Sequence, residues 1–182
     1  MKKLANKFAN LIGAHPMEII FTSCATESNN AAIHAALKAN PSKRYIVTSA
    51  VEHSSVLNYC KALEVEGYRV TYLPVDRDGL LNLYDLDNAI TDATAIVSLM
   101  WANNETGVLF PVKEIAEICQ SRAVLYHCDA VQAVGKVDIN VRNVPIDYLS
   151  LTGHKFHADG GERISSLRDT IRRQYAGVFA GR

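Results

Sequence analysis

Apolar segments of strand length alternate with segments of helical periodicity along most of the 182-residue chain. This alternation is typical of βαβ units, in which a helix crosses from one parallel strand to the next. Strands covered on both faces are apolar throughout, and the run from Thr94 to Trp101 has this character. The sequence therefore predicts an α/β fold with a mainly parallel sheet flanked by helices.

The predicted elements follow one another without a repeat or a low-complexity linker. Strands are expected over residues 18–22, 45–49, 68–73, 94–101, 123–128 and 146–151. Helices are expected where apolar residues recur at helical spacing, over residues 4–12, 29–39, 54–66, 84–90 and 112–121. Gly13 and Pro16 should end the first helix, and Gly67 the third.

The composition excludes several classes of protein. Lys and Arg together number 19, as do Asp and Glu, and 48% of the residues are hydrophobic. Neutrality argues against a protein that binds nucleic acid or a membrane surface through bulk charge. The longest apolar runs are too short to cross a bilayer, and the start at Lys2 and Lys3 lacks the apolar stretch of a signal peptide. We expect a cytoplasmic protein.

Charge is unevenly distributed. Residues 1–161 carry 14 bases and 17 acids, whereas residues 162–182 carry five bases, all arginine, and two acids. We therefore predict a body over 1–161 and a divergent, arginine-rich tail over 162–182. Apolar residues in the tail could form a short amphipathic helix, with a frayed end as the alternative: Ile164, Leu167 and Ile171.

Cysteines and histidines show no metal-binding pattern. The four cysteines include no CxxC pair, so we expect them to be reduced and mostly buried: Cys24, Cys60, Cys119 and Cys128. No two histidines stand four residues apart on a predicted helix. The sequence assigns no metal.

Polar clusters follow five of the predicted strands, at residues 22–27, 52–53, 103–105, 127–132 and 152–155. The carboxyl ends of parallel strands meet at one edge of a sheet, where open α/β sheets bind ligands. Neither GxGxxG after a strand nor GxxxxGK[ST] is present, which removes the two common nucleotide cradles. We expect another ligand at this edge.

The first cluster suits an anion. A predicted strand runs into small hydroxylated residues before a helix, so backbone N–H groups and the hydroxyls of Ser23 and Thr26 could face a phosphate. Helix capping by Thr26 or Ser28 is an alternative use of the same residues.

Asp129 and Lys155 suggest the rest of the ligand. Asp129 ends an apolar strand and would need a cation there, such as a protonated heterocyclic nitrogen. Lys155, partly shielded from water, could lose its proton and attack an aldehyde. A phosphate, a ring nitrogen and an aldehyde together indicate pyridoxal 5′-phosphate.

Five motifs resemble those of the pyridoxal-phosphate-dependent cysteine desulfurases of the NifS/IscS class, within the class-V aminotransferases. They are Thr22-Ser-Cys-Ala-Thr-Glu27, Val51-Glu-His53, Asn103-Asn-Glu-Thr-Gly107, His127-Cys-Asp-Ala-Val-Gln132 and Thr152-Gly-His-Lys155. The resemblance covers roughly residues 1–157. It implies the large domain of a fold-type I enzyme.

The resemblance also implies residue roles. Lys155 would hold the cofactor as a Schiff base and shuttle protons, and His53 would stack on the ring and assist proton transfer. Asp129 would pair with the pyridinium nitrogen. The other implied cofactor contacts are Ala25, Thr26, Thr152 and His154 at the phosphate, Gln132 at the phenolic oxygen, and Asn104 near the cofactor and the substrate carboxylate.

In this family, L-cysteine is converted to L-alanine and a persulfide that supplies iron–sulfur clusters. The resemblance therefore also implies a homodimer and an iron–sulfur scaffold protein as sulfur acceptor. Because the cofactor residues do not choose the substrate, a selenocysteine lyase and a non-catalytic cofactor-binding remnant are alternatives.

Several positions depart from the family pattern. Cys24 replaces a glycine, Cys128 takes a usually apolar position, and Ala158-Asp-Gly-Gly161 replaces a Pro-Lys-Gly sequence. No cysteine lies in a Ser-Ser-Gly-Ser-Ala-Cys-like loop, and the family's substrate-carboxylate arginine has no counterpart. We expect a truncated form with little turnover, whose tail arises from a frameshift, a gene truncation or a rearranged junction.

Overall fold

The computed structural model describes residues 2–153 and 168–171. Its helices are α1 (Lys2–Ile12), the 3-10 helix η1 (Pro16–Glu18), α2 (Ala25–Ala39), α3 (Ser54–Val65), α4 (Leu83–Ala89) and α5 (Val112–Ser121). Its strands are β1 (Ile19–Thr22), β2 (Tyr45–Ser49), β3 (Arg69–Leu73), β4 (Thr94–Met100), β5 (Leu125–Asp129), β6 (Tyr148–Ser150) and β7 (Arg168–Ile171).

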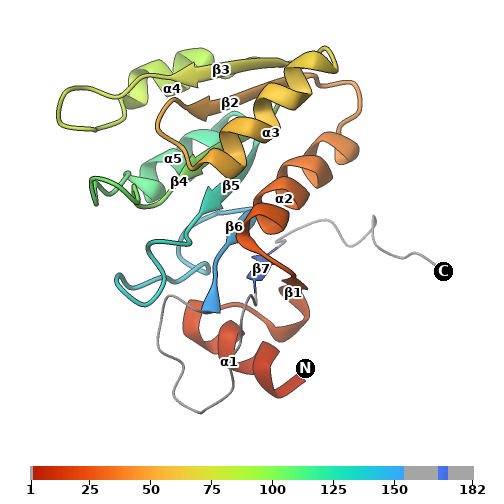
Figure 1. Cartoon of the computed structure of the whole chain (residues 1–182), viewed down its shortest axis with the longest axis vertical. Coiled ribbons are helices and arrows are strands. Elements are labelled where there is room, and N and C mark those ends of the chain that lie inside the picture. Colours follow the sequence, from red (N-terminus) through yellow and green to blue (C-terminus); the bar gives the residue numbers. More distant parts are fainter. Residues whose placement is uncertain (1, 154–167, 172–182) are drawn as a thin grey trace.

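The described strands form one sheet in the order β1-β7-β6-β5-β4-β2-β3 (Figure 1). The pairs β2–β3, β2–β4, β4–β5 and β5–β6 are parallel. Strand β7 is antiparallel to both β1 and β6, so β1 runs in the same direction as β6. The predicted α/β fold with a mainly parallel sheet is confirmed.

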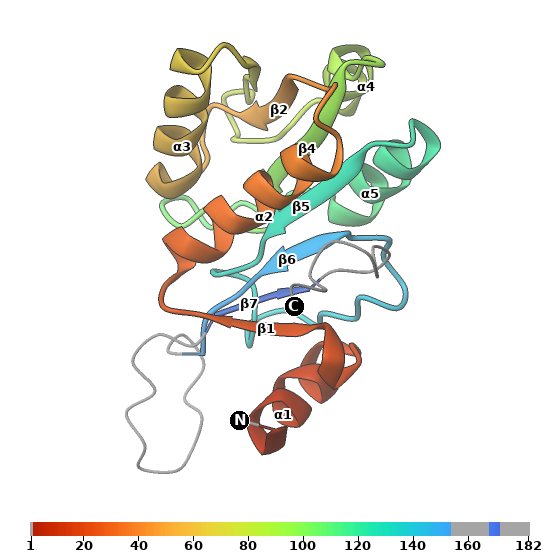
Figure 2. The ribbon, with the colours of Figure 1, turned by 90° about the vertical axis from the view of Figure 1, so that its right-hand side faces the viewer.

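Helices cover both faces of the sheet. Figure 2 shows α2 and α3 on one face and α4 and α5 on the other, with α1 beside β1. On β4, Ile96 belongs to the apolar cluster under α2 and α3, whereas Val97 and Leu99 belong to the cluster under α5. Both faces of β4 are therefore buried, which explains its uninterrupted apolar sequence.

Strand β7 corrects the prediction for the tail. Residues 168–171, expected within an amphipathic helix, form a strand between β1 and β6. All four residues pair with β1, and Thr170 also pairs with Ser150 of β6, so pairing within the sheet outweighs a short helical pattern. The remainder of the predicted helix lies outside the described residues.

Helix α2 also differs from its prediction, since it begins at Ala25 and not at residue 29. The polar residues of its first turn hid its start from the apolar periodicity. Its N-cap is Cys24, so capping by Thr26 or Ser28 is wrong. The N-terminus of α2 therefore lies directly after β1, at the predicted phosphate position.

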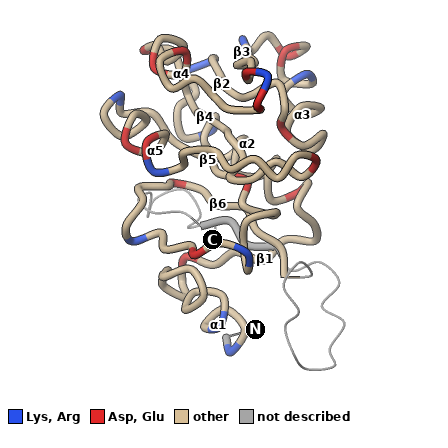
Figure 3. The backbone as a smooth tube through the Cα atoms, turned by 90° about the vertical axis from the view of Figure 1, so that its left-hand side faces the viewer, with Lys and Arg blue, Asp and Glu red and all other residues tan. Residues whose placement is uncertain are grey.

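Positions of basic and acidic residues alternate along the backbone (Figure 3). Arg122, after α5, forms an ion pair of 2.6 Å with Asp87 of α4, and Lys113 pairs with Glu117 along α5. Such exposed pairs are screened by solvent and contribute little to stability. In the part of the chain that the structure describes, no helix has the length and apolarity needed to cross a membrane.

Candidate active site

Strands β1, β2, β4, β5 and β6 point in one direction, so their carboxyl ends meet at one edge of the sheet. The five polar clusters follow these ends in the chain. The structure describes four of them fully and the fifth only to Gly153. His154 and Lys155 lie outside the described residues.

Asp129, the last residue of β5, is 8% exposed. Its Oδ2 accepts a hydrogen bond of 2.7 Å from Nδ2 of Asn29, and its Oδ1 accepts one of 3.0 Å from the backbone N–H of Val131. Its backbone carbonyl accepts from the N–H of Trp101 at 2.9 Å. Donors to both oxygens favour a fixed, ionised carboxylate.

His53 is the N-cap of α3 and is exposed. Its Nδ1 accepts a hydrogen bond of 3.2 Å from the backbone N–H of Ser55 and lies 2.8 Å from the Ser55 hydroxyl. That hydroxyl also accepts a bond of 2.9 Å from Asn29 Nδ2. Two predicted site residues, His53 and Asp129, are thus connected through Asn29 and Ser55.

The N-terminus of α2 carries Ala25, which is buried, and Thr26, which is exposed. Glu27 accepts a hydrogen bond of 2.6 Å from the backbone N–H of Ser23 and another from its hydroxyl, and these bonds lower the pKa of the Glu27 carboxyl. The Ser23 hydroxyl is therefore engaged by Glu27 and does not face an anion as predicted. The first N–H groups of a helix remain the anion-binding element.

Asn104 and Gln132 line one pocket between the loops after β4 and β5. The loop is shaped by Asn103, whose Oδ1 accepts 2.9 Å bonds from the N–H groups of Glu105 and Thr106. Asn103 Nδ2 donates to the carbonyl of Val51 at 3.1 Å, which ties this loop to the segment before His53.

Two further buried groups support this edge of the sheet. Glu52 accepts hydrogen bonds from the Ser49 hydroxyl at 2.7 Å and the Met100 N–H at 3.0 Å, and burial raises the pKa of its carboxyl to about 8. His127 contacts the hydroxyls of Ser98 at 2.8 Å and Ser150 at 2.9 Å. Burial lowers the pKa of His127 to about 3, so this ring is neutral.

The Ser150 hydroxyl also accepts a hydrogen bond of 3.1 Å from the Ser28 hydroxyl, so the first turn of α2 is attached to the end of β6. Thr152, two residues further along the chain, is fully buried. The predicted phosphate residues of α2 and of the segment after β6 are thereby brought to one region.

Asn29 and Ser55 were not among the predicted site residues. A signal for Asn29 exists, because it lies on the buried face of α2 among mostly small and apolar residues: Ala25, Ser28, Ala32, Ile33, Ala36 and Leu37. A polar side chain on such a face needs a partner. Nothing in the sequence identifies that partner.

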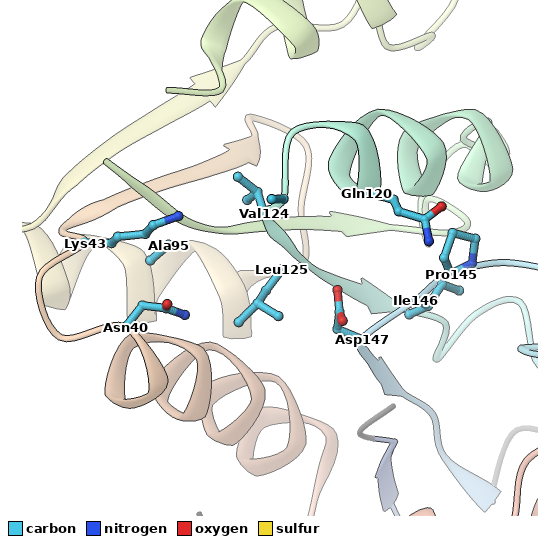
Figure 4. A pocket seen from close by; sticks show the side chains of 10 residues that line it. Asn40, Lys43, Ala95, Gln120, Val124, Leu125, Pro145, Ile146 and Asp147 are labelled. Carbon is cyan, nitrogen blue, oxygen red and sulfur yellow. The ribbon is translucent and has the colours of Figure 1, made fainter. Parts of the chain in front are cut away.

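A second pocket lies at the opposite edge of the sheet (Figure 4). It is lined by residues at the starts of strands, including Ala95 of β4 and Leu125 of β5, together with Asp147. Asp147 accepts a hydrogen bond of 2.8 Å from the N–H of Tyr126 there. This pocket contains none of the predicted site residues.

Solved structures share this fold. A NifS-like protein superposes with a TM-score of 0.87 at 37% identity, covering 95% of this chain and 47% of that protein. A structure described as SspA in complex with cysteine gives a TM-score of 0.86 at 36% identity, covering 94% of this chain and 48% of that protein. The fold and the carboxyl-edge site define an α/β domain of the fold-type I class.

Sequence comparison gives the family. The aminotransferase class-V profile matches residues 1–181, so the chain belongs to the class-V aminotransferase family. Cysteine desulfurase 2 of Trichormus variabilis is 50% identical over 172 residues, which are 94% of this chain and 43% of that protein. Cysteine desulfurase NifS of Azotobacter vinelandii is 49% identical over 169 residues, 92% of this chain and 42% of that protein.

The chain thus spans less than half the length of these curated relatives. The family match extends past Gly161, and β7 lies in the same sheet as β1 and β6.

Proposed function

We propose that this chain is the cofactor-binding part of a cysteine desulfurase, which uses pyridoxal 5′-phosphate to convert L-cysteine to L-alanine and persulfide sulfur. The observation that carries the proposal is the buried Asp129 carboxylate at the end of β5, with hydrogen-bond donors on both oxygens. Relatives at about 50% identity that bear the name cysteine desulfurase support the substrate.

The described residues fit this cofactor. An ionised carboxylate at the end of an otherwise apolar strand suits a protonated pyridine nitrogen. The N-terminus of α2, at Ala25 and Thr26, suits a phosphate, with Thr152 as a further contact. The pocket that contains Asn104 and Gln132 would receive the phenolic oxygen and the substrate carboxylate.

When bound, pyridoxal phosphate supplies an electron sink for negative charge that develops on the substrate. Asp129 would keep the ring nitrogen protonated, and His53 would stack on the ring and transfer protons. Lys155 and His154 are assigned from the sequence alone: Lys155 would hold the cofactor and move protons, and His154 would bind the phosphate.

Three of the four cysteines are poor candidates for the sulfur-accepting nucleophile. Cys60, Cys119 and Cys128 are buried. Burial raises the pKa of the Cys60 and Cys119 thiols to about 12 and also raises the pKa of Cys128. The thiolate is the nucleophilic form, so none of these three buried thiols is favoured as the nucleophile. We expect little sulfide release from cysteine by this chain alone.

A cofactor titration tests the proposal. The purified chain should turn yellow with pyridoxal phosphate, and Lys155→Ala should stay colourless. Lys113→Ala is the matched control, because Lys113 is exposed on α5, and it should colour like the wild type. Equal colour in Lys155→Ala and wild type would overturn the lysine assignment.

The remaining assignments rest on the family resemblance. We propose a cytoplasmic homodimer that passes sulfur to an iron–sulfur scaffold protein, with a cofactor domain over 1–161 and a tail over 162–182 that adds β7 to the sheet of this domain. Light scattering during size-exclusion chromatography should give twice the mass of one chain, and a monomer mass would refute the dimer.

A further inference from the structure

Asn29 donates hydrogen bonds to two groups of the site, the Asp129 carboxylate and the Ser55 hydroxyl. It lies in α2 and is fully buried. Its single amide nitrogen donates to Oδ2 of Asp129 at 2.7 Å and to Oγ of Ser55 at 2.9 Å. Both N–H bonds of this amide are therefore used, one toward β5 and one toward α3.

The orientation of this amide is set by charge. Exchanging its oxygen and nitrogen would bring Oδ1 against the Asp129 carboxylate, where two acceptors would repel. In the observed orientation, Asn29 Oδ1 is buried and has no hydrogen-bond partner among the described residues. Buried polar atoms without partners are uncommon. The two donated bonds, one of them to a carboxylate, therefore hold the amide in a single orientation.

The contacts of Ser55 determine which ring nitrogen of His53 carries the proton. Nδ1 of His53 accepts from the backbone N–H of Ser55, so this nitrogen carries no proton. The Ser55 hydroxyl, 2.8 Å away, must then donate to Nδ1, which leaves its lone pair to accept from Asn29. A neutral imidazole whose Nδ1 is an acceptor carries its proton on Nε2.

We propose that Asn29 is a positioning residue for the reaction: it orients the Asp129 carboxylate and, by donating to the Ser55 hydroxyl, directs the proton of that hydroxyl to Nδ1 of His53. This inference rests on the proposed function, since His53 and Asp129 are the groups assigned to the cofactor ring. The Asn29 amide would thereby position two groups, Asp129 of β5 and His53 before α3, that are both proposed to contact the cofactor ring.

The first test uses the cofactor-free chain and two-bond ¹H–¹⁵N NMR spectra of its imidazoles, with His53 assigned from His53→Gln. In Asn29→Asp, the new carboxylate accepts the Ser55 hydroxyl proton, so Nδ1 of His53 loses a donor and its nitrogen resonance moves downfield. Ser55→Ala should give the same shift. Ser28→Ala, which alters the neighbouring contact to Ser150, should leave the resonance unchanged.

The second test uses the chain loaded with pyridoxal phosphate. Asn29→Asp should raise the cofactor dissociation constant about tenfold or more, as expected for losing a hydrogen bond to a charged group. It should also reduce the circular dichroism of the bound cofactor in the visible region. Ser55→Ala should change both signals less than Asn29→Asp does, because it keeps the Asn29 hydrogen bond to Asp129 and loses only the hydroxyl contact to His53.

A shift in both tests for Asn29→Asp supports the proposal, and an unchanged His53 resonance or unchanged cofactor signals overturn it. If Asn29→Asp does not fold, Asn29→Leu removes both donors without adding charge and is judged by the cofactor signals in the same way. If the wild type stays colourless with pyridoxal phosphate, the proposed function fails. The His53 resonance still decides the Asn29 arrangement in that case.

Discussion

Glu52 accepts a hydrogen bond of 3.0 Å from the backbone N–H of Met100, so this carboxyl group connects the segment after β2 to the last residue of β4. The same oxygen, Oε1, accepts from the Ser49 hydroxyl at 2.7 Å, while Oε2 is buried without a partner among the described residues. A carboxylate with one unsolvated oxygen is costly, and burial raises the pKa of Glu52 to about 8. The group is therefore a neutral acid in the folded chain near neutral pH.

We expect this group to make the protein less stable in mild alkali. The folded chain binds the Glu52 proton more tightly than the unfolded chain, in which the pKa of this carboxyl has its ordinary value of 4.5. The resulting stability is fully present below pH 4.5 and is lost as the pH rises to about 8, at up to about 1.4 kcal/mol per pH unit. Urea unfolding across this range measures the loss.

Glu52→Gln separates this effect from general alkaline unfolding. The glutamine keeps an acceptor for Ser49 and Met100 but does not ionise, so its free energy of unfolding should fall less between pH 6.5 and 8. A variant curve parallel to that of the wild type would show that Glu52 does not titrate in this window.

His127 should make the folded protein less stable at acidic pH. Its folded pKa, lowered by burial to about 3, lies below the ordinary value of 6.5. The unfolded chain thus binds more protons, and stability present above pH 6.5 is lost as the pH falls toward 3. Between pH 4.5 and 6.5 the contributions of Glu52 and His127 oppose each other, so these two groups predict a stability plateau there.

His127→Gln should reduce the loss of stability toward acidic pH, which is the acid limb of the stability curve. It should also lower the free energy of unfolding at neutral pH, because the contacts to Ser98 and Ser150 are disturbed. The control is His34→Gln on the exposed face of α2, which should leave the acid limb in place. Persistence of the full acid limb in His127→Gln would assign it to other groups.

Strongly periodic segments could be predicted from the sequence. Helix α5 and strand β2 have the predicted bounds, because α5 has a clear helical period after Pro111 and β2 is a short run of mainly aromatic and β-branched residues. The convergence of the polar clusters also followed from strand direction. Strand β7 could not be predicted, since four residues inserted between two distant strands carry no local signal.

The Asn29 network shows the same limit at the site. Asn29 and Asp129 are 100 residues apart in the chain, and only the packing of α2 on β5 makes them partners. The resemblance to the family identified Asp129 and His53 through their motifs. Residues that act through them, such as Ser55, became apparent only from side-chain geometry.

Thiol labelling should distinguish Cys24 from the other cysteines. Cys24 is partly exposed at the start of α2, whereas Cys60, Cys119 and Cys128 are buried with raised thiol pKa values. A disulfide reagent should therefore modify one thiol per native chain rapidly and the others only as the chain unfolds. Cys24→Ser should abolish the fast phase. A fast phase that survives this change would show that one of the other three thiols is accessible in the folded chain.

Two glycines with positive φ allow backbone strain to be measured apart from steric clash. Gly107, in the loop that carries Asn104, has φ 75° and nothing within 4 Å of an added Cβ. Gly13, after α1, has φ 72°, and a Cβ there would lie 2.5 Å from Oδ1 of Asn140. Gly107→Ala should cost about 1 kcal/mol from the left-handed backbone alone. Gly13→Ala should cost clearly more, because Asn140 must also move and its bond to the Arg142 N–H is disturbed. Thermal unfolding of the two variants compares the costs directly, and equal losses would mean that the 140–142 loop yields freely to the added methyl group.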